Sequence, residues 1–157
     1  MTELRVVAAE DSAKSVFDNL IQFYLYDMAA QSEFPLNAQG RYDYDMLERF
    51  WQHPYLFLLE GKIAGFALVI RDCPIRPRSP CWFMAEFCVL RPYQRQGIGS
   101  SAVRAILKQH TGAWEIGWLE TNAPASRFWP AVTPAKDRAD QSFMFDTQAW
   151  ASLAFTA

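Results

Sequence analysis

The spacing of apolar residues changes period along the first third of the chain. Residues 2–9 alternate between apolar and polar side chains, which predicts a first β-strand. The segment 11–30 then has apolar residues three and four positions apart, which predicts a helix. Its core-facing residues are expected to be Val16, Leu20, Phe23 and Met28. A shorter helix is predicted over 41–52.

Strand-like alternation returns in the middle of the chain. Two alternating runs within 55–72 flank Gly61 and predict a β-hairpin that turns at that glycine. The proline-rich stretch 73–80 cannot continue a central strand and is expected to be a connector. The remaining predicted elements are strand 81–90, helix 97–110, strand 113–121, helix 123–132 and strand 141–147. This order favours a mixed α/β layer over a sandwich or a helical bundle.

Composition narrows the function classes. With 157 residues, 51% of them hydrophobic, the chain has enough apolar material for one ordinary core, so a single domain is expected over 1–157. A formal net charge of −2 argues against a general nucleic-acid binder or a membrane-surface binder, because both normally carry a basic excess. No stretch reaches the roughly 18 apolar residues that a membrane span needs.

Cysteine spacing and the N-terminal residues indicate the cellular compartment in which the protein is expected. The three cysteines, Cys73, Cys81 and Cys88, lack the Cys-x-x-Cys spacing of a zinc site or a redox pair. The N-terminal stretch carries charged residues and no apolar run, which is not typical of a signal peptide. We therefore expect a cytoplasmic protein whose cysteines are reduced.

A basic stretch with two glycines joins the strand predicted at 81–90 to the helix predicted at 97–110. The first N–H groups of a helix lack internal partners, and the helix dipole favours negative charge there. Glycine lets the backbone approach an anion, and Arg95 and Arg91 can add charge-assisted contacts. The stretch is neither a Walker A loop nor a dinucleotide-binding loop, since neither glycine pattern is present. It predicts an anion site at the start of the helix.

Two motifs in this region resemble those of one enzyme family. The residues from Gln94 to Gly99 match the Gln/Arg-x-x-Gly-x-Gly/Ala signature of the GNAT-type N-acetyltransferase superfamily. Downstream, Asn122 is followed by Ala125 three positions later and by an aromatic pair that ends at Trp129, which is similar to the second motif of that family. One predicted helix and one predicted strand separate the two motifs, as the family requires.

The resemblance implies both a fold and a coenzyme. The GNAT fold is a mixed central sheet of about six to seven strands flanked by helices, with splayed fourth and fifth strands. The activity implied is transfer of an acetyl group from acetyl-CoA to a primary amine of a small molecule or peptide. Val89 would pair through its main chain with the pantetheine arm, and Asn122 would reach that arm from the other side. The pyrophosphate would lie on the backbone N–H groups of Arg95, Gln96, Gly97, Ile98 and Gly99.

One position departs from the family pattern. Many family members have a proton-donating Tyr where this chain has Trp129. An indole N–H can donate a hydrogen bond, but it is not a practical proton source at neutral pH. This departure keeps an alternative open, an acyl-CoA-binding module of the same fold with little or no turnover.

Two glutamates are candidates for the general base. Glu86 lies in the predicted fourth strand, beside the implied thioester site, although a structural pairing with an arginine is the alternative. Strand alternation, unless a bulge interrupts it, places Glu86 and Cys88 opposite Phe83, Ala85, Phe87 and Val89. Glu120, at the end of the predicted fifth strand, is the second candidate, and a solvated strand end is its alternative.

The other polar side chains give no specific indication of a catalytic role. The spacing of Tyr24, Tyr26, Tyr93 and His53 singles out none of them as an acid or base. No Cys/His or Ser/His constellation has a recognisable spacing, so direct attack by the amine is expected in place of an acetyl-enzyme. No cluster of metal ligands is visible in the sequence.

The acceptor side is expected to include the acidic segment 26–45, because the family builds its acceptor pocket from the first two helices and their loop. The carboxylates of this segment are Asp27, Glu33, Asp43 and Asp45. They would suit a cationic amine, or they simply solvate a surface loop. The expected partner is thus an amine substrate, with no nucleic acid and no membrane, and with a possible homodimer.

Overall fold

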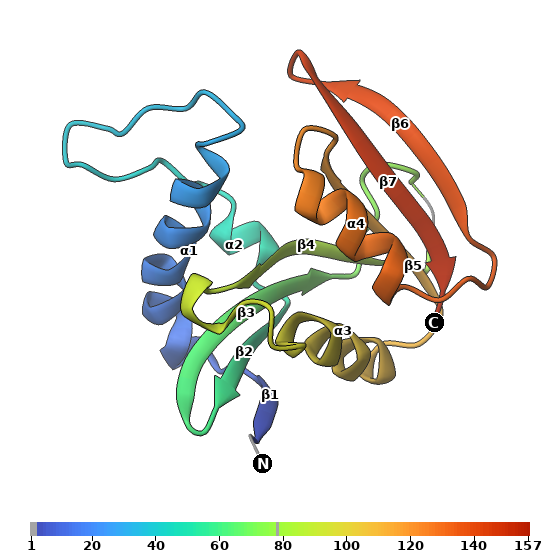
Figure 1. The fold of residues 1–157 in the computed structure, drawn as a ribbon, viewed down its shortest axis with the longest axis horizontal. Coiled ribbons are helices and arrows are strands. Elements are labelled where there is room, and N and C mark those ends of the chain that lie inside the picture. The colour runs from blue at the N-terminus through green and yellow to red at the C-terminus, as the bar shows by residue number, and fades with distance from the viewer. Residues whose placement is uncertain (1–2, 78) are drawn as a thin grey trace.

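The computed structural model describes residues 3–77 and 79–157, and these form one seven-stranded mixed sheet with helices on both faces (Figure 1). The strand order is β1-β2-β3-β4-β5-β7-β6. The strands are β1 (Leu4–Ala8), β2 (His53–Leu59), β3 (Lys62–Ile70), β4 (Trp82–Val89), β5 (Ala113–Leu119), β6 (Ala139–Phe145) and β7 (Gln148–Thr156). The helices are α1 (Lys14–Met28), α2 (Leu47–Phe50), α3 (Ile98–Gln109) and α4 (Ala123–Val132), with short 3-10 turns η1 (Asp11–Ala13) and η2 (Arg91–Tyr93). This arrangement confirms the predicted mixed α/β sheet.

Two hydrophobic cores lie on opposite faces of the sheet. On one face, α3 and α4 pack on β2, β3, β4, β5 and β7 around the fully buried Trp114. On the other face, α1 packs on β3 and β4, and α2 lies at the edge of this second core. The second core is built from Phe17, Leu20, Ile21, Leu25, Phe66, Leu68 and Cys88. The side chains of each inner strand are therefore divided between an α3 face and an α1 face.

The fourth and fifth strands splay apart, as the resemblance implied. β4 and β5 run parallel and pair only at Trp82 with Trp114 and at Phe83 with Glu115. Beyond these two pairs β4 and β5 diverge and no longer pair, and we call the region between the two diverging strands the V. On its other side β4 pairs with β3 along most of its length, so only its β5-facing edge lacks a strand partner.

Two predictions about the first helices need correction. The buried stripe of α1 is Phe17, Leu20, Ile21 and Leu25. These positions have the spacing of one helical face, which leaves Phe23 on the opposite side with 60% of its surface exposed. The helix expected over 41–52 is helical only in α2. The reason is that the Gln22 side chain bonds both the N–H and the carbonyl of Tyr42, at 2.8 and 2.9 Å, and holds that segment extended along α1.

The β2–β3 hairpin is predictable from the sequence, whereas the β6–β7 hairpin is not. The β2–β3 hairpin forms as predicted, with Glu60 and Gly61 at φ 51° and 79° in its two-residue turn. The last strand predicted from the sequence ends at residue 147, so β7 was not predicted. That strand follows a turn of Asp146 and Thr147 at φ 50° and 63°. A two-residue turn with both φ positive normally contains glycine, so this pair carries no turn signal.

The cysteines are not all reduced, contrary to expectation. Cys73 and Cys81 form a disulfide in the loop between β3 and β4, with their Cα atoms 5.8 Å apart. Cys88 is a free, buried thiol. Cysteine spacing does not predict this pair, because the two residues are eight positions apart and meet only through the fold of the loop. Among the residues that the structure describes, no helix is long and apolar enough to cross a bilayer.

Candidate functional site

The glycine stretch forms a turn of mixed handedness that ends in the N-terminus of α3. Arg95 has φ 62°, and Gly97, the N-cap, has φ 77°. The first bond of the helix runs from the Ser101 N–H to the Gly97 carbonyl at 3.1 Å. The N–H groups between these two residues therefore have no acceptor within the helix. Together with the helix dipole they make the predicted anion site.

The two arginines near this turn have different partners. Arg95 is exposed and makes no ion pair with any described residue, so its charge is available to an anion. Arg91 is already paired, since its guanidinium lies 2.8 Å from the Asp27 carboxylate of α1. Gln96 is also exposed and donates to the Pro92 carbonyl at 3.2 Å. Arg95 is therefore the cation that can serve the anion site.

Val89 presents its main chain to the V. The next residue, Leu90, donates its N–H to Ala64 of β3 at 2.8 Å. Because successive peptide groups of a strand point to opposite sides, the N–H and carbonyl of Val89 face the open edge. The carbonyl accepts a hydrogen bond from Gln94 Nε2 at 2.8 Å.

Asn122 caps the N-terminus of α4, and Gly99 packs closely against the same helix. Asn122 is the N-cap of α4, and its Oδ1 accepts from the Ala125 N–H at 3.1 Å. Gly99 lies under α4, since a Cβ at this position would be 3.0 Å from the Phe128 ring. The glycine is thus required by helix packing as well as by backbone approach to an anion.

Glu86 faces α1 because of a bulge in β4. Leu68 pairs with Glu86 and Val69 pairs with Met84, so Ala85 has no partner on β3. On the N-terminal side of the bulge Met84 belongs to the α3 core, and on its C-terminal side Phe87 packs against the same core. The expected common face of Ala85 and Phe87 is therefore wrong, because the extra residue shifts the alternation. The expected common side of Glu86 and Cys88, which face α1, is confirmed.

The Glu86 carboxyl is enclosed by two tyrosines. The Tyr24 hydroxyl of α1 donates to Glu86 Oε1 at 3.4 Å. Tyr44, from the segment before α2, is a second neighbour, and its buried hydroxyl has no hydrogen bond of good geometry to any described residue. Burial raises the pKa of Glu86 to about 7, although the hydroxyls of Tyr44 and Tyr24 act in the opposite direction. A carboxyl with this pKa can take up or release a proton near neutral pH.

The tyrosines carry no signal that sequence spacing can detect, since each reaches Glu86 from a different element. Burial, followed by the Glu86 charge, raises the pKa of Tyr24 and of Tyr44. Both therefore stay protonated and can donate to the carboxylate. Of the other residues that spacing left open, Tyr26 is 67% exposed and His53 contacts His110 instead.

Comparison with known proteins identifies the family of this chain. The chain matches the description "Acetyltransferase (GNAT) family" over residues 21–131, which is more than two thirds of its length. The chain belongs to the GNAT family. This confirms the predicted family and the enzyme class, N-acetyltransferase. A search of curated proteins finds no match.

Solved structures agree on the fold at low sequence identity. A GNAT-family acetyltransferase from Streptococcus agalactiae has a TM-score of 0.70 at 10% identity, covering 98% of this chain and 95% of that one. An N-acetyltransferase from Staphylococcus aureus has a TM-score of 0.67 at 14% identity, covering 96% and 99%. The ribosomal-protein-S18-alanine N-acetyltransferase from Escherichia coli has a TM-score of 0.61 at 12% identity, covering 98% and 94%. These likenesses bear on the fold alone.

Within this GNAT chain, the residue at the usual tyrosine position is part of the core. Trp129 is 7% exposed and packs edge-on against Phe87, with ring centroids 5.1 Å apart. Phe128 also contacts it, at 4.8 Å. The Trp129 indole N–H makes no hydrogen bond with any described residue.

The remaining candidates lie apart from this constellation. Glu120 is exposed just beyond β5, and its main-chain N–H donates to Ala149 at 3.0 Å. Cys88 is buried, and burial, Asp27 and Glu86 together raise the pKa of its thiol to about 12. Among the described residues, no group of three or more His, Cys, Asp or Glu side chains is placed to hold a metal ion.

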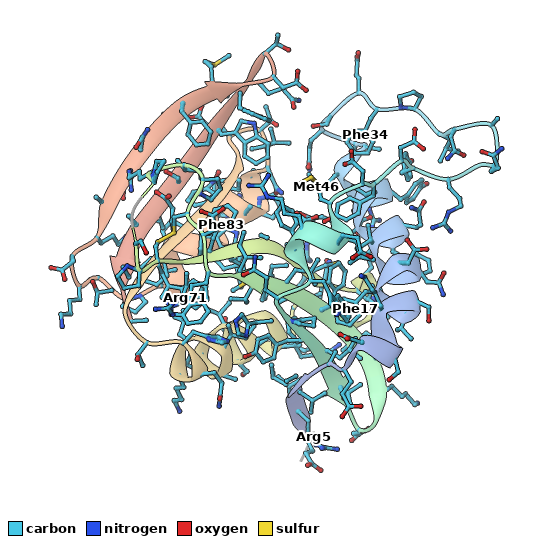
Figure 2. The ribbon with its side chains drawn as sticks, turned by 180° about the vertical axis from the view of Figure 1, so that it is seen from behind. Arg5, Phe17, Phe34, Met46, Arg71 and Phe83 are labelled. Carbon is cyan, nitrogen blue, oxygen red and sulfur yellow. A yellow bond between two sulfur atoms is a disulfide. The ribbon has the colours of Figure 1, made fainter. Side chains whose placement is uncertain are left out.

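The acidic segment forms a loop with a cavity of about 440 Å³. Its lining is Leu25, Phe34, Pro35, Leu36, Asn37 and Asp43. The end of this loop nearest α1 meets the opposite side of the V, where Gln148 Nε2 of β7 donates to the Ser32 hydroxyl at 3.0 Å. Seen from behind, Met46 and Phe83 lie between α1 and the β6–β7 hairpin (Figure 2).

Proposed function

We propose that this GNAT chain transfers an acetyl group from acetyl-CoA to a primary amine of a small molecule or a peptide. The observation that carries the proposal is Glu86, a carboxyl on the α1 face of β4 whose pKa is raised to about 7 by burial. An amine attacks a thioester only when it is neutral, so a base that works near neutral pH is what this reaction needs.

The coenzyme side rests on main-chain groups, on one arginine and on Asn122. The turn from Arg95 to Gly99 supplies unpaired N–H groups and one unpaired guanidinium, which suit a pyrophosphate. Val89 offers its main chain to the pantetheine arm, and Asn122 lies at the N-terminus of α4, across the V. When bound, acetyl-CoA supplies the activated acetyl group.

The acceptor side would orient the amine and take its proton. Glu86 is the proposed general base, with Tyr24 and Tyr44 holding its carboxyl. The loop cavity is the proposed acceptor pocket, because its wall contains Leu25 and Asp43, the chain neighbours of the two tyrosines. The Asp43 carboxylate would attract a cationic amine. Glu120 stays a second candidate for the base, with no buried environment to support it.

Direct attack is favoured over an acetyl-enzyme. Cys88 is the nucleophile nearest to Glu86 along β4, and a thiol whose pKa is raised to about 12 is almost entirely protonated at neutral pH. We expect no added acetyl group after incubation with acetyl-CoA alone, as measured by intact mass. An acetylated Cys88 that passes its acetyl group to an added amine would contradict direct attack.

One experiment separates transfer from the alternative, an acyl-CoA-binding module. The observation that favours the alternative is Trp129 at the usual tyrosine position. Calorimetry with acetyl-CoA measures binding, and release of free CoA with a panel of primary amines measures turnover. Binding with amine-dependent release supports the enzyme. Binding without release by any amine supports the module, and no binding refutes both.

A further inference from the structure

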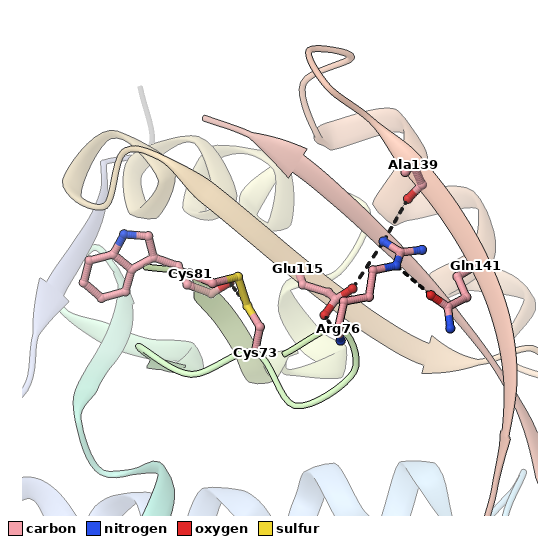
Figure 3. A network of polar contacts seen from close by, with 7 residues as sticks. Cys73, Arg76, Cys81, Glu115, Ala139 and Gln141 are labelled. Carbon is pink, nitrogen blue, oxygen red and sulfur yellow. Dashed lines mark hydrogen bonds and ion pairs between the residues drawn. A yellow bond between two sulfur atoms is a disulfide. The ribbon is translucent and has the colours of Figure 1, made fainter. Parts of the chain in front are cut away.

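One arginine pins the loop between β3 and β4 to the C-terminal half of the sheet (Figure 3). Arg76 Nε donates to Gln141 Oε1 at 2.6 Å, and Nη1 donates to the Ala139 carbonyl at 3.3 Å. Its Nη1 also lies 3.3 Å from Glu115 Oε2, and its main-chain N–H donates to Glu115 Oε1 at 2.9 Å. Arg76 thus ties the loop to β5 and to β6. We call these four residues the Arg76 clamp.

Glu115 makes this clamp strong. Its side chain is fully buried, with 0% of its surface exposed, while the Arg76 side chain is 24% exposed. Among the described residues, Arg76 is the one cation paired with it. A buried carboxylate that loses its counter-charge is strongly unfavourable, so Glu115 and Arg76 depend on each other.

The clamp lies where the V begins. Glu115 is opposite Phe83 in the last pair between β4 and β5 before the strands diverge. Two residues further along β5, the Ile75 side chain covers Gly117, where a Cβ would be only 2.8 Å from Ile75 Cδ1. On this face the α1 core contains β3 and β4 but no described residue of β5, β6 or β7. On this face the two halves are joined by the clamp, by the contact of Ile75 with Gly117, and by the bond between Ser32 and Gln148.

The loop that carries Arg76 is closed covalently. Cys73 and Cys81, both almost fully buried, form a disulfide across its base, next to the first residue of β4. A closed loop has fewer conformations when detached, so it holds Arg76 near Glu115 at lower entropic cost than an open one.

We propose that Arg76 is a positioning residue that sets the opening of the V, and that the Cys73–Cys81 disulfide makes its hold redox-dependent. The inference rests on the proposed use of the V for acetyl-CoA. Reduction by a dithiol breaks the protein disulfide and leaves two thiols, while the dithiol gives up two hydrogens and becomes a cyclic disulfide. The open loop then releases Arg76 more easily, and β5 with β6 moves more freely against β4.

The first test compares oxidised and dithiol-reduced protein without ligand. Alkylation under denaturing conditions identifies the two states, because only Cys88 reacts in the oxidised chain, whereas Cys73 and Cys81 also react in the reduced one. We expect amide hydrogen exchange to accelerate in β5 and β6 on reduction and to stay unchanged in β1 and β2. By calorimetry, acetyl-CoA affinity should fall about 5- to 150-fold, the usual range for coupling between two sites.

Matched variants separate the effect of the clamp from the effect of the disulfide. A Cys73→Ser, Cys81→Ser double variant should behave as reduced protein and ignore the dithiol. Arg76→Met should reproduce the loss of affinity in oxidised protein, and Arg76→Lys should recover part of it by restoring the charge. If Arg76→Met does not fold, the comparison of oxidised and reduced wild-type protein still tests the proposal.

Three outcomes overturn the proposal. They are equal exchange and affinity in both redox states, uniformly faster exchange over the whole sheet, and failure of Cys73 and Cys81 to pair after treatment with glutathione disulfide. If oxidised protein does not bind acetyl-CoA, the proposed function fails instead. The exchange data alone then decide whether the clamp holds β5.

Discussion

The two sides of the V are built in different ways. The proposed coenzyme side comes from one continuous stretch, from the end of β4 through α3 and β5 to the start of α4, and its proposed binding groups are main-chain N–H groups at a helix start. The acceptor side joins distant segments: Tyr24 meets Glu86 across 62 positions, and Ser32 meets Gln148 across 116. Local sequence encodes the first, and only the assembled fold creates the second.

The two sides also differ in solvation. Arg95 and Gln96 are exposed, so any charge or hydrogen bond that they add to the proposed coenzyme site would be screened by solvent and modest. Glu86 lies among buried side chains, where desolvation is large enough to move its pKa to about 7. Changes on the coenzyme side should therefore act on affinity, and changes on the acceptor side should act on kcat.

Glu86→Gln should lower kcat by about 10² to 10⁴, the range for removing a general base. Acetyl-CoA affinity should not change. In the wild-type enzyme kcat should rise as pH increases through about 7, because the base acts only when it is deprotonated. The variant should lose this rise. Steady-state kinetics over a range of pH, with calorimetry for affinity, measures both.

Glu120→Gln is the matched control for that prediction. Glu120 is exposed and lies beyond the end of β5, so its loss should leave kcat and its pH dependence unchanged. A large drop in kcat with Glu120→Gln and little change with Glu86→Gln would reverse the assignment of the base.

This contrast explains how far the sequence could predict the site. The turn from Arg95 to Gly99 and the N-cap Asn122 were accessible, because glycine positions and helix starts are local properties. The side of Glu86 was undecided, because the bulge at Ala85 depends on pairing with β3. Tyr44 could not be found at all, since its role follows from the way the segment before α2 lies along α1.

The closed end of the V, which both sides share, should be acid-sensitive. His110 is 8% exposed, and the Tyr55 hydroxyl lies 2.6 Å from its Nε2. Burial, then His53 and Arg71, lower the pKa of His110 to about 4. The unfolded chain, with a pKa near 6.5, binds the proton first. Stability from this group is therefore full above pH of about 6.5 and is lost as pH falls toward 4, up to about 3 kcal/mol.

Chemical denaturation at several pH values measures this loss. The Glu86→Gln background is the proper reference, because Glu86, with a pKa raised to about 7, has the opposite linkage and stabilises the fold as pH falls. Adding His110→Gln should flatten the remaining pH dependence between about 6.5 and 4. An equally steep loss of stability in both proteins would show that His110 is not its source.

Gly97→Ala should weaken acetyl-CoA binding by about tenfold, or 1.4 kcal/mol. Gly97 has φ 77° and open space around its Cα, so the added methyl group strains the turn without a clash. In the free variant the turn leaves the left-handed region to relieve this strain, and binding must restore it at a cost of about 1–2 kcal/mol. Gly61→Ala is the matched control, because Gly61 has φ 79° with equally open space but lies in the β2–β3 turn. Equal affinity in the two variants would remove the basis for the anion site.

The rest of the fold shows the same limit of local information. The Glu60-Gly61 turn was predicted because glycine marks it, whereas the Asp146-Thr147 turn has no such mark and β7 was missed with it. Phe23 fitted a helical stripe on α1 but lies outside, since β3 selects a neighbouring stripe. The Cys73–Cys81 pair depends on a loop shape that no spacing rule covers.

Trp129 should show the smallest effect, because it is a packing residue of the core on the α3 face. Its indole N–H makes no hydrogen bond with the described residues, and its ring packs on Phe87 at 5.1 Å. The departing thiolate is a good leaving group that water can protonate. Trp129→Tyr should therefore leave kcat unchanged or raise it modestly, and Trp129→Phe should lower it by less than about tenfold, or 1.4 kcal/mol. A larger loss of kcat in Trp129→Phe, with unfolding and acetyl-CoA affinity unchanged, would show that the indole N–H acts in the transfer and that this side chain belongs to the chemistry.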